Sequence, residues 1–208
     1  MNARNFDKLM QEQIARAHGE KPKLLLHCCC APCASACLER LQEFFEITVL
    51  FYNPNIEDDE YERRKAEIKR FIEETGFADF IDCDHTEKDF YCAVKGLENE
   101  KEGGARCEKC FELRLAETAR TADENGFDYF TTTLTISPLK SAKIINEIGE
   151  KLQNQAKWLY SDFKKRNGYL RSTELSQQHD LYRQNYCGCV FSRRDAQSTQ
   201  TLENRKKL

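Results

Sequence analysis

Three groups of cysteines have the spacing of sites that bind metals or exchange electrons. They are the run Cys28-Cys29-Cys30, the CxxC pair Cys107 and Cys110, and the pair Cys187 and Cys189 around one glycine. The 208-residue chain holds 11 cysteines but only 4 histidines. An odd number of cysteines, with three in a row, does not suit a framework of structural disulfides. Reduced thiols with metal or redox chemistry are therefore indicated.

The CxxC pair lies near the predicted start of a helix. Residues three apart share one face of a helix, so the sulfurs of Cys107 and Cys110 can point to one centre. We expect the positive end of the helix to lower the pKa of both thiols, which favours the thiolate that binds metal. A lone CxxC pair is equally typical of a redox pair or of half a zinc site, so a second pair of ligands is needed.

The cysteine run can supply that second pair. Adjacent strand residues point to opposite faces, so Cys28, Cys29 and Cys30 cannot all bind one centre unless the chain bends before Pro32. Four thiolates from the two segments suit structural zinc or an iron–sulfur cluster. Zinc ribbons usually have two CxxC knuckles, so the contiguous pair favours iron–sulfur. Cys33 is close enough in sequence to reach the same site.

The segment from Cys187 to Cys189 can close a small, strained disulfide. Strained disulfides are the labile and catalytic kind, and this one would exchange two electrons; the alternative is a pair of plain surface thiols.

Other cysteines and polar residues have simpler interpretations. Packing is predicted for Cys37, Cys83, Cys92 and His27, and a polar loop, or an acid or metal ligand, for Asp82, Asp84 and His85.

Strands that alternate with helices predict an α/β fold with an open, mostly parallel sheet flanked by helices. The predicted strands are 23–30, 46–52, 77–82, 127–133 and 157–160, and the predicted helices follow Pro32 or span 58–75, 87–95, 107–125, 139–153 and part of 171–182. Ligands of such sheets bind beyond the carboxyl ends of the strands, where the strand order reverses. The first strand delivers the cysteine run to that edge. No GxGxxG or GxxxxGK[ST] sequence follows it, so neither a dinucleotide site nor a P-loop is indicated.

Composition and charge divide the chain into four predicted parts. They are a polar N-terminal helix or tail (1–22), an α/β domain (23–160), an extension with the C-G-C sequence (161–192) and a basic tail (193–208). Residues 1–138 carry a net charge of −10 and residues 139–208 one of +7. The basic C-terminal third suits a nucleic-acid partner or a solvated basic face.

No apolar run reaches the roughly 18 residues of a membrane span, and the N-terminus lacks an apolar signal segment. We therefore expect a cytoplasmic protein that does not associate with a membrane.

Five segments form a distinctive set of motifs. They are LLLHCCCAPCA (24–34), FYNPNI (51–56), EGGARCEKCFELRLAETA (102–119), FDYFTTTLTISPLKSAKIINEIG (127–149) and DFKKRNGYLRSTELSQQHDLYRQNYCGCVFS (162–192). Together they closely resemble the cobalamin-independent epoxyqueuosine reductases (QueH). The resemblance implies an oxidoreductase that removes the epoxide oxygen of epoxyqueuosine in tRNA, the last step of queuosine biosynthesis. It also implies a Rossmann-type domain like that of the adenine nucleotide alpha hydrolases, with a C-terminal extension of helix and loop.

The resemblance also implies roles for particular cysteines. Cys29, Cys30, Cys107 and Cys110 match the ligands of a 4Fe–4S cluster, and Cys187 and Cys189 match a redox-active disulfide. Cys28 falls on a variable position of the motif and stays outside the ligand set. A second, mononuclear iron nearby, held by Cys33 or an aspartate, is left open. The implied partners are tRNA with epoxyqueuosine in its anticodon loop and an electron donor that the sequence does not identify, and we expect a monomer.

Two other functions are alternatives. An ATP-dependent, tRNA-thiolating transferase would share the fold and the CxxC pair, but it would carry SGGxDS after the first strand, where this chain has HCCCAPC. A zinc module that binds RNA or protein would leave the C-G-C pair without a purpose. It would also be colourless and redox-silent, which distinguishes it from an iron–sulfur enzyme.

Overall fold

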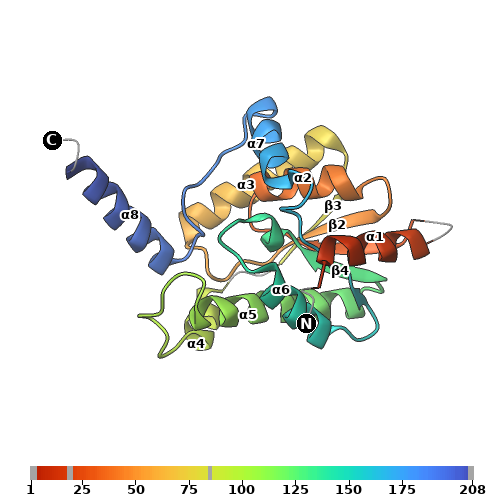
Figure 1. Cartoon of the computed structure of the whole chain (residues 1–208), viewed down its shortest axis with the longest axis horizontal. Helices are drawn as coiled ribbons and strands as arrows, with labels where there is room; N and C mark the ends of the chain where they lie inside the picture. Colours follow the sequence, from red (N-terminus) through yellow and green to blue (C-terminus); the bar gives the residue numbers. More distant parts are fainter. Residues whose placement is uncertain (1–3, 18–20, 84–85, 206–208) are drawn as a thin grey trace.

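A five-stranded, all-parallel sheet forms the centre of the molecule (Figure 1). The computed structural model describes residues 4–17, 21–83 and 86–205. The strands are β1 (Lys23–His27), β2 (Glu46–Phe51), β3 (Asp79–Asp82), β4 (Tyr129–Thr132) and β5 (Lys157–Trp158), in the order β3-β2-β1-β4-β5. The strand order therefore reverses between β1 and β4. The predicted parallel α/β sheet is confirmed, and its topology is Rossmann-like.

Helices cover both faces of the sheet (Figure 1). One face carries α2 (Ala31–Leu41), α3 (Asp58–Thr75) and α7 (Gly168–Gln178), and the other carries α5 (Ala105–Glu124) and α6 (Ala142–Leu152). The remaining helices are α4 (Glu87–Ala93), which packs on α5, α1 (Phe6–Arg16), which contacts α6, and α8 (Val190–Arg205), which projects from the body. Among the described residues, none of these helices is both long and apolar enough to cross a membrane.

The ends of the chain have more regular structure than their composition indicates. The polar N-terminal segment contains α1, which buries Phe6 and Met10. Most of the basic C-terminal segment belongs to α8. The division of the chain into four parts remains a prediction.

Alternation along β1 divides its leucines between two hydrophobic cores. Leu24 and Leu26 pack in the core under α2 and α3, and Leu25 packs in the core under α5 and α6. All three are fully buried, as expected for a central parallel strand with both faces covered. The same alternation continues to Cys28 and Cys29, which belong to different cores, and it ends at Cys30, the residue that precedes α2.

Particular residues mark the ends of several helices and strands. Pro32 lies in the first turn of α2, where its missing N–H is not needed, and Gly76 ends α3 with φ of 65°. β4 ends one residue earlier than predicted because the hydroxyl of Thr132 accepts the N–H of Leu134. This contact starts a 3₁₀ helix, η1 (Thr133–Ile136), immediately after the strand.

Candidate active site

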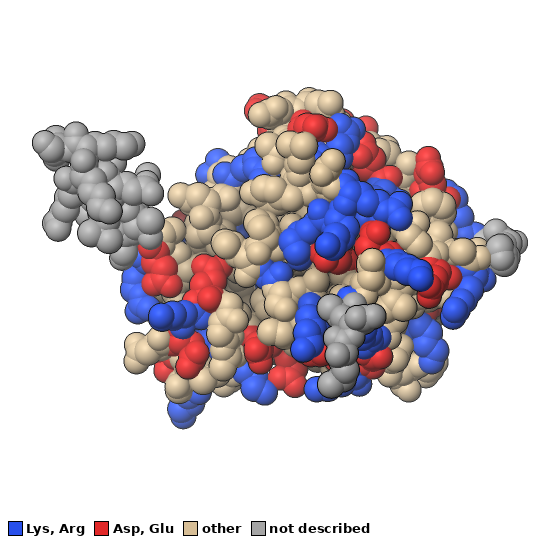
Figure 2. Space-filling view, viewed as in Figure 1, with Lys and Arg blue, Asp and Glu red and all other residues tan. Residues whose placement is uncertain are grey.

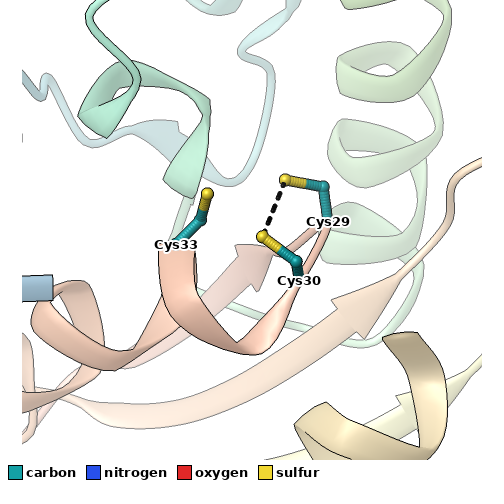
Figure 3. A group of neighbouring side chains, drawn as sticks. All are labelled: Cys29, Cys30 and Cys33. Carbon is teal, nitrogen blue, oxygen red and sulfur yellow. Dashed lines mark hydrogen bonds between the residues drawn. The ribbon is translucent and has the colours of Figure 1, made fainter. Parts of the chain in front are cut away.

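Three thiols gather where β1 ends and α2 begins. Cys29 and Cys30 lie in the bend between these elements, and Cys33 lies in the first turn of α2 (Figure 3). The three sulfur atoms lie within 4.8 Å of one another, and those of Cys29 and Cys30 are 3.9 Å apart. Such a group of soft ligands can hold a metal. These three residues are called the thiol triad below.

Cys28 faces away from the thiol triad. It is fully buried in the core under α2, whereas Cys29 and Cys30 pack against the core under α5. Its carbonyl oxygen accepts a hydrogen bond from Nδ2 of Asn53 at 2.8 Å. Cys28 therefore lies apart from the other two cysteines of the run, and its exclusion from the ligand set stays a prediction.

Two adjoining cavities lie beside the thiol triad. The outer cavity has a volume of about 630 Å³, and the inner cavity has one of about 20 Å³. Cysteines line both: Cys29, Cys33 and Cys187 the outer cavity, and Cys107, Cys110, Cys187 and Cys189 the inner one. Lys140 lines both cavities as well. The three cysteine motifs, which are far apart in the chain, therefore surround one region beyond the carboxyl ends of β1 and β4.

The predicted ligand residues are arranged in two places. Cys29 and Cys30 lie in the thiol triad with Cys33. The spacing in the sequence had left open whether Cys33 lies at the same site. Cys107 and Cys110 line the inner cavity, and their sulfurs are not part of the group within 4.8 Å. The structure thus brings both predicted pairs to adjoining cavities.

The residues predicted to serve packing or loops have varied surroundings. Cys37 is fully buried and donates a hydrogen bond to the carbonyl oxygen of Cys33, so its predicted packing is confirmed. Cys92 is exposed, so the packing predicted for it is wrong. Asp82 forms ion pairs with Lys65 and Lys69 near the surface. Asp84 and His85, for which the sequence offered the same alternatives, lie outside the described residues.

A fully buried arginine on α5 brings positive charge to the thiols. Arg114 donates from Nε to Nε2 of His27 at 3.2 Å and from Nη2 to Oδ1 of Asn53 at 2.6 Å. Its Nη1 lies 3.9 Å from the sulfur of Cys110. None of these described partners is a carboxylate. Because a buried charge needs compensation, thiolates, or an anionic group that they bind, are the natural counter-charge.

His27 holds this arginine in place as a neutral ring. Burial, together with the nearby charge of Arg114, lowers the pKa of His27 to about 3. Nε2 of His27 lies 3.2 Å from Nε of Arg114 and 3.1 Å from the carbonyl oxygen of Tyr52, and Nδ1 lies 2.8 Å from Oγ1 of Thr132. The core position predicted for His27 is confirmed, and it also orients a buried cation beside the site.

A second buried arginine and a glycine position the segment of residues 187–189, called the CGC segment below. Arg64 on α3 donates from Nη1 to the carbonyl oxygen of Cys187 at 3.0 Å. Gly188 has φ of 123°, and a Cβ atom there would lie 2.8 Å from Cγ1 of Ile56 and 3.0 Å from Nη1 of Arg64. Glycine suits both the backbone conformation and the close approach. Both thiols of the segment are free.

Neighbouring groups and burial give the thiols different pKa values. Hydrogen bonds with the thiols of Cys30 and Cys33 lower the pKa of Cys29, and the same contact with Cys29 raises the pKa of Cys30 to about 12. Burial raises the pKa of Cys107, and it raises that of Cys110 to about 12. The expectation that the helix terminus lowers the pKa of the CxxC pair is therefore wrong for the metal-free protein. Desolvation outweighs the helix dipole there.

Unpaired polar atoms of two buried residues adjoin the inner cavity. Both amide atoms of Asn55, and Nε and Nη2 of Arg106, have no hydrogen-bond partner among the described residues. Both side chains line the inner cavity. Each such atom costs about 1–3 kcal/mol while it stays unpaired, so a polar or anionic group bound here is favoured. A metal cluster held by thiolates is anionic, and these residues fit such a group.

Comparisons with known proteins give one consistent result. A sequence profile for epoxyqueuosine reductase QueH matches residues 24–195, which include all three cysteine groups. A Streptococcus pyogenes serotype M1 protein with that name is 45% identical over 198 residues, or 90% of this chain and 78% of its own length. Its namesake from Staphylococcus epidermidis is 43% identical over 200 residues, covering 90% and 84%. That from Thermotoga maritima is 36% identical over 176 residues, covering 81% and 89%.

Proposed function

Because this chain belongs to the epoxyqueuosine reductase QueH family, we propose that its two cysteine-lined cavities are the site where epoxyqueuosine in tRNA is reduced to queuosine. The chain is an oxidoreductase of queuosine biosynthesis. The observation that carries the assignment of the site is the meeting of three cysteine motifs around Cys187, at the switch point of a parallel sheet.

In this proposal, Cys29, Cys30, Cys107 and Cys110 hold a 4Fe–4S cluster. Such a cluster supplies electrons one at a time. The buried charge of Arg114 and the unpaired atoms near the inner cavity support an anionic group in this region. Cys33, the third thiol of the triad, is the ligand that we propose for a second, mononuclear iron.

The dithiol of the CGC segment can supply what the reaction consumes. Removal of the epoxide oxygen breaks two C–O bonds, forms a C=C bond and releases the oxygen as water, which requires two electrons and two protons. Formation of a disulfide between Cys187 and Cys189 releases two electrons and two protons. An external electron donor then reduces the disulfide after each turnover. Cys187 lines both cavities, so it is the thiol available to that donor.

Lys140 is the proposed proton donor to the departing oxygen. It lines both cavities beside Cys187. Burial alone would lower the pKa of Lys140, but its electrostatic interactions with the sulfurs of Cys187 and Cys29 raise it above its usual value. The ammonium group therefore stays protonated at neutral pH, and a positioned acid assists the loss of the oxygen.

The partners follow from the same chemistry. The substrate nucleoside belongs to an anticodon loop, and the net charge of +7 in residues 139–208 suits the phosphates of tRNA. All proposed ligands come from one chain, so a monomer suffices. Free thiols at the site suit the reducing cytoplasm.

The proposal is tested with anaerobically purified protein. We expect iron and acid-labile sulfide in the wild type, and conversion of epoxyqueuosine to queuosine in tRNA when a strong reductant is added. Cys29→Ser should lose the iron, and Cys187→Ser should keep it but lose turnover. Cys92→Ser is the matched control, because that thiol is exposed and lines neither cavity. A preparation with zinc alone, or equal activity in all variants, would contradict the proposal.

A further inference from the structure

Exposed apolar side chains gather around the opening of the outer cavity. Tyr169 and Leu139 both line it, although they are 46% and 71% exposed. Leu170, next to Tyr169, is 57% exposed. Large apolar side chains left in solvent around one opening mark a binding site rather than a stable surface.

The outer cavity leads from this opening to the thiols. Cys29, Cys33 and Cys187 belong to its lining. Its volume of about 630 Å³ lies within the range of roughly 300–1,000 Å³ typical of small-molecule sites. The cavity thus suits a single nucleoside that has left its stack, and a base-paired stem would have to stay outside.

Tyr169 is held at the opening by a neighbouring arginine. The guanidinium carbon of Arg183 lies 5.8 Å from the centre of the Tyr169 ring, within the range of a cation–π contact. Arg183 is itself fixed by hydrogen bonds from Nη1 to the carbonyl oxygen of Ser172 and to Oγ of Ser176. The ring is therefore positioned on α7 before a ligand arrives.

Positive charge continues from the cavity over the adjoining surface. Lys140 lines the cavity, and Nζ of Lys164 donates to its carbonyl oxygen at 3.4 Å. Lys165 and Arg166 follow in the chain and are exposed. Lys164 and Arg166 also form ion pairs with Asp162 and Asp7, so Lys165 carries the least compensated of these charges. Figure 2 shows that Lys and Arg side chains gather on this face between α7 and α1. An aromatic ring beside such charge is the arrangement that single-stranded nucleic acid uses, with bases on the ring and phosphates on the cations.

We propose that the outer cavity receives one unpaired nucleoside of an RNA loop and that Tyr169 stacks on its base. Unpaired bases in RNA loops can leave their stack and pack against aromatic side chains. The identity of the nucleoside as epoxyqueuosine rests on the proposed function, but the stacking contact does not. Loss of one base–aromatic stack weakens binding roughly 5- to 150-fold.

The experiment measures binding of a fluorescently labelled RNA stem-loop, with epoxyqueuosine in its loop, to the anaerobic holoprotein without reductant. Tyr169→Ala should raise the dissociation constant roughly 5- to 150-fold, and Tyr169→Phe should restore it. The salt dependence of binding should stay unchanged in Tyr169→Ala, whereas Lys165→Gln should reduce its slope by about 1. Iron content is measured for each variant to show that the site is intact.

Phe44→Ala is the matched control. Phe44 is 42% exposed, like Tyr169, but it lies just before β2, at the opposite end of the parallel sheet from the cavity. Equal affinities of Tyr169→Ala and Phe44→Ala for the stem-loop would overturn the stacking contact, as would an equal loss of affinity for a fully paired RNA. Binding is measured without turnover, so an enzyme that binds through Tyr169 but forms no queuosine would contradict only the proposed function.

Discussion

At the scale of residues, buried cations prepare the site for sulfur chemistry. Arg114 lies against Cys110, and Arg64 holds the main chain of Cys187. The type and spacing of the cysteines predicted which thiols form the site. Nothing in the sequence predicted the burial of Arg64, because arginine is usually exposed and only tertiary contacts show where it is buried. Arg114 did carry a signal, since it follows Cys110 by four residues and so shares its face of α5.

Replacement of Lys140 tests its role as proton donor. Lys140→Met should lower the first-order rate of queuosine formation roughly 100- to 10,000-fold, the usual effect of losing a general acid. Lys140→Arg should keep the positive charge and part of the rate. The measurement is rapid-quench turnover across a pH series, with iron content as the control. A Lys140→Met enzyme with the wild-type rate and pH profile would rule out this role.

Replacement of Gly188 tests the geometry of the CGC segment. Gly188→Ala should lower turnover about 100-fold, because a displacement of about 1 Å at a reacting group has effects of that size. Gly96→Ala is the matched control, since Gly96 also has positive φ, of 83°, but a Cβ atom there meets nothing within 4 Å. Both variants should lose about 1–3 kcal/mol of stability through backbone strain. Equal turnover of the two variants would refute the importance of the close approach.

At the scale of helices and strands, the hydrophobic pattern predicted the order and type of most elements. The boundaries differ where a side chain or a tertiary contact intervenes: β4 ends at Thr132 because of its own hydroxyl, and β5 is limited to Lys157 and Trp158. The pKa of the CxxC thiols was mispredicted for a related reason. A helix terminus is visible in a sequence, but the burial that outweighs its dipole depends on packing.

The contact between α6 and β5 gives a prediction at this scale. A Cβ atom on Gly149 would lie 2.2 Å from Cδ2 of Trp158. In an open helix, a change from glycine to alanine stabilises by about 1 kcal/mol. Gly149→Ala should instead destabilise by about 1–3 kcal/mol through overpacking, as measured by urea unfolding. The double variant with Trp158→Phe should lose less than the sum of the single changes, and strictly additive losses would disprove the clash.

The ion pair between α2 and α7 predicts a dependence on pH. Arg171 donates from Nε and Nη2 to the two carboxylate oxygens of Glu39, and these hydrogen bonds lower the pKa of Glu39 below its usual 4.5. The pair therefore stabilises the fold above about pH 4.5 and loses this effect as the pH falls through the lowered pKa. Both side chains are over a third exposed, so a double-mutant cycle of Arg171→Gln and Glu39→Gln should give about 0.2–1 kcal/mol at pH 7. A coupling free energy that is unchanged at pH 3 would contradict this assignment.

At the scale of the whole molecule, the parallel sheet explains how three distant motifs meet. The reversal of strand order between β1 and β4 opens a crevice, to which the two strands deliver the cysteine run and Lys140. This edge could be predicted from the alternation of strands and helices. The position of the CGC segment could not, since it depends on Arg64 and Ile56 from other elements. For the same reason, the sequence did not separate the triad of Cys29, Cys30 and Cys33 from the inner cavity.

The most direct test is a single turnover without external reductant. Holoprotein is reduced, freed of reductant under anaerobic conditions and mixed with an excess of tRNA that contains epoxyqueuosine. The dithiol of Cys187 and Cys189 holds the two electrons and two protons that the reaction requires. We predict a burst of about one queuosine per chain, accompanied by loss of two free thiols, and no burst in Cys187→Ser. An equal burst in Cys187→Ser, or queuosine formed without loss of thiols, would contradict the account.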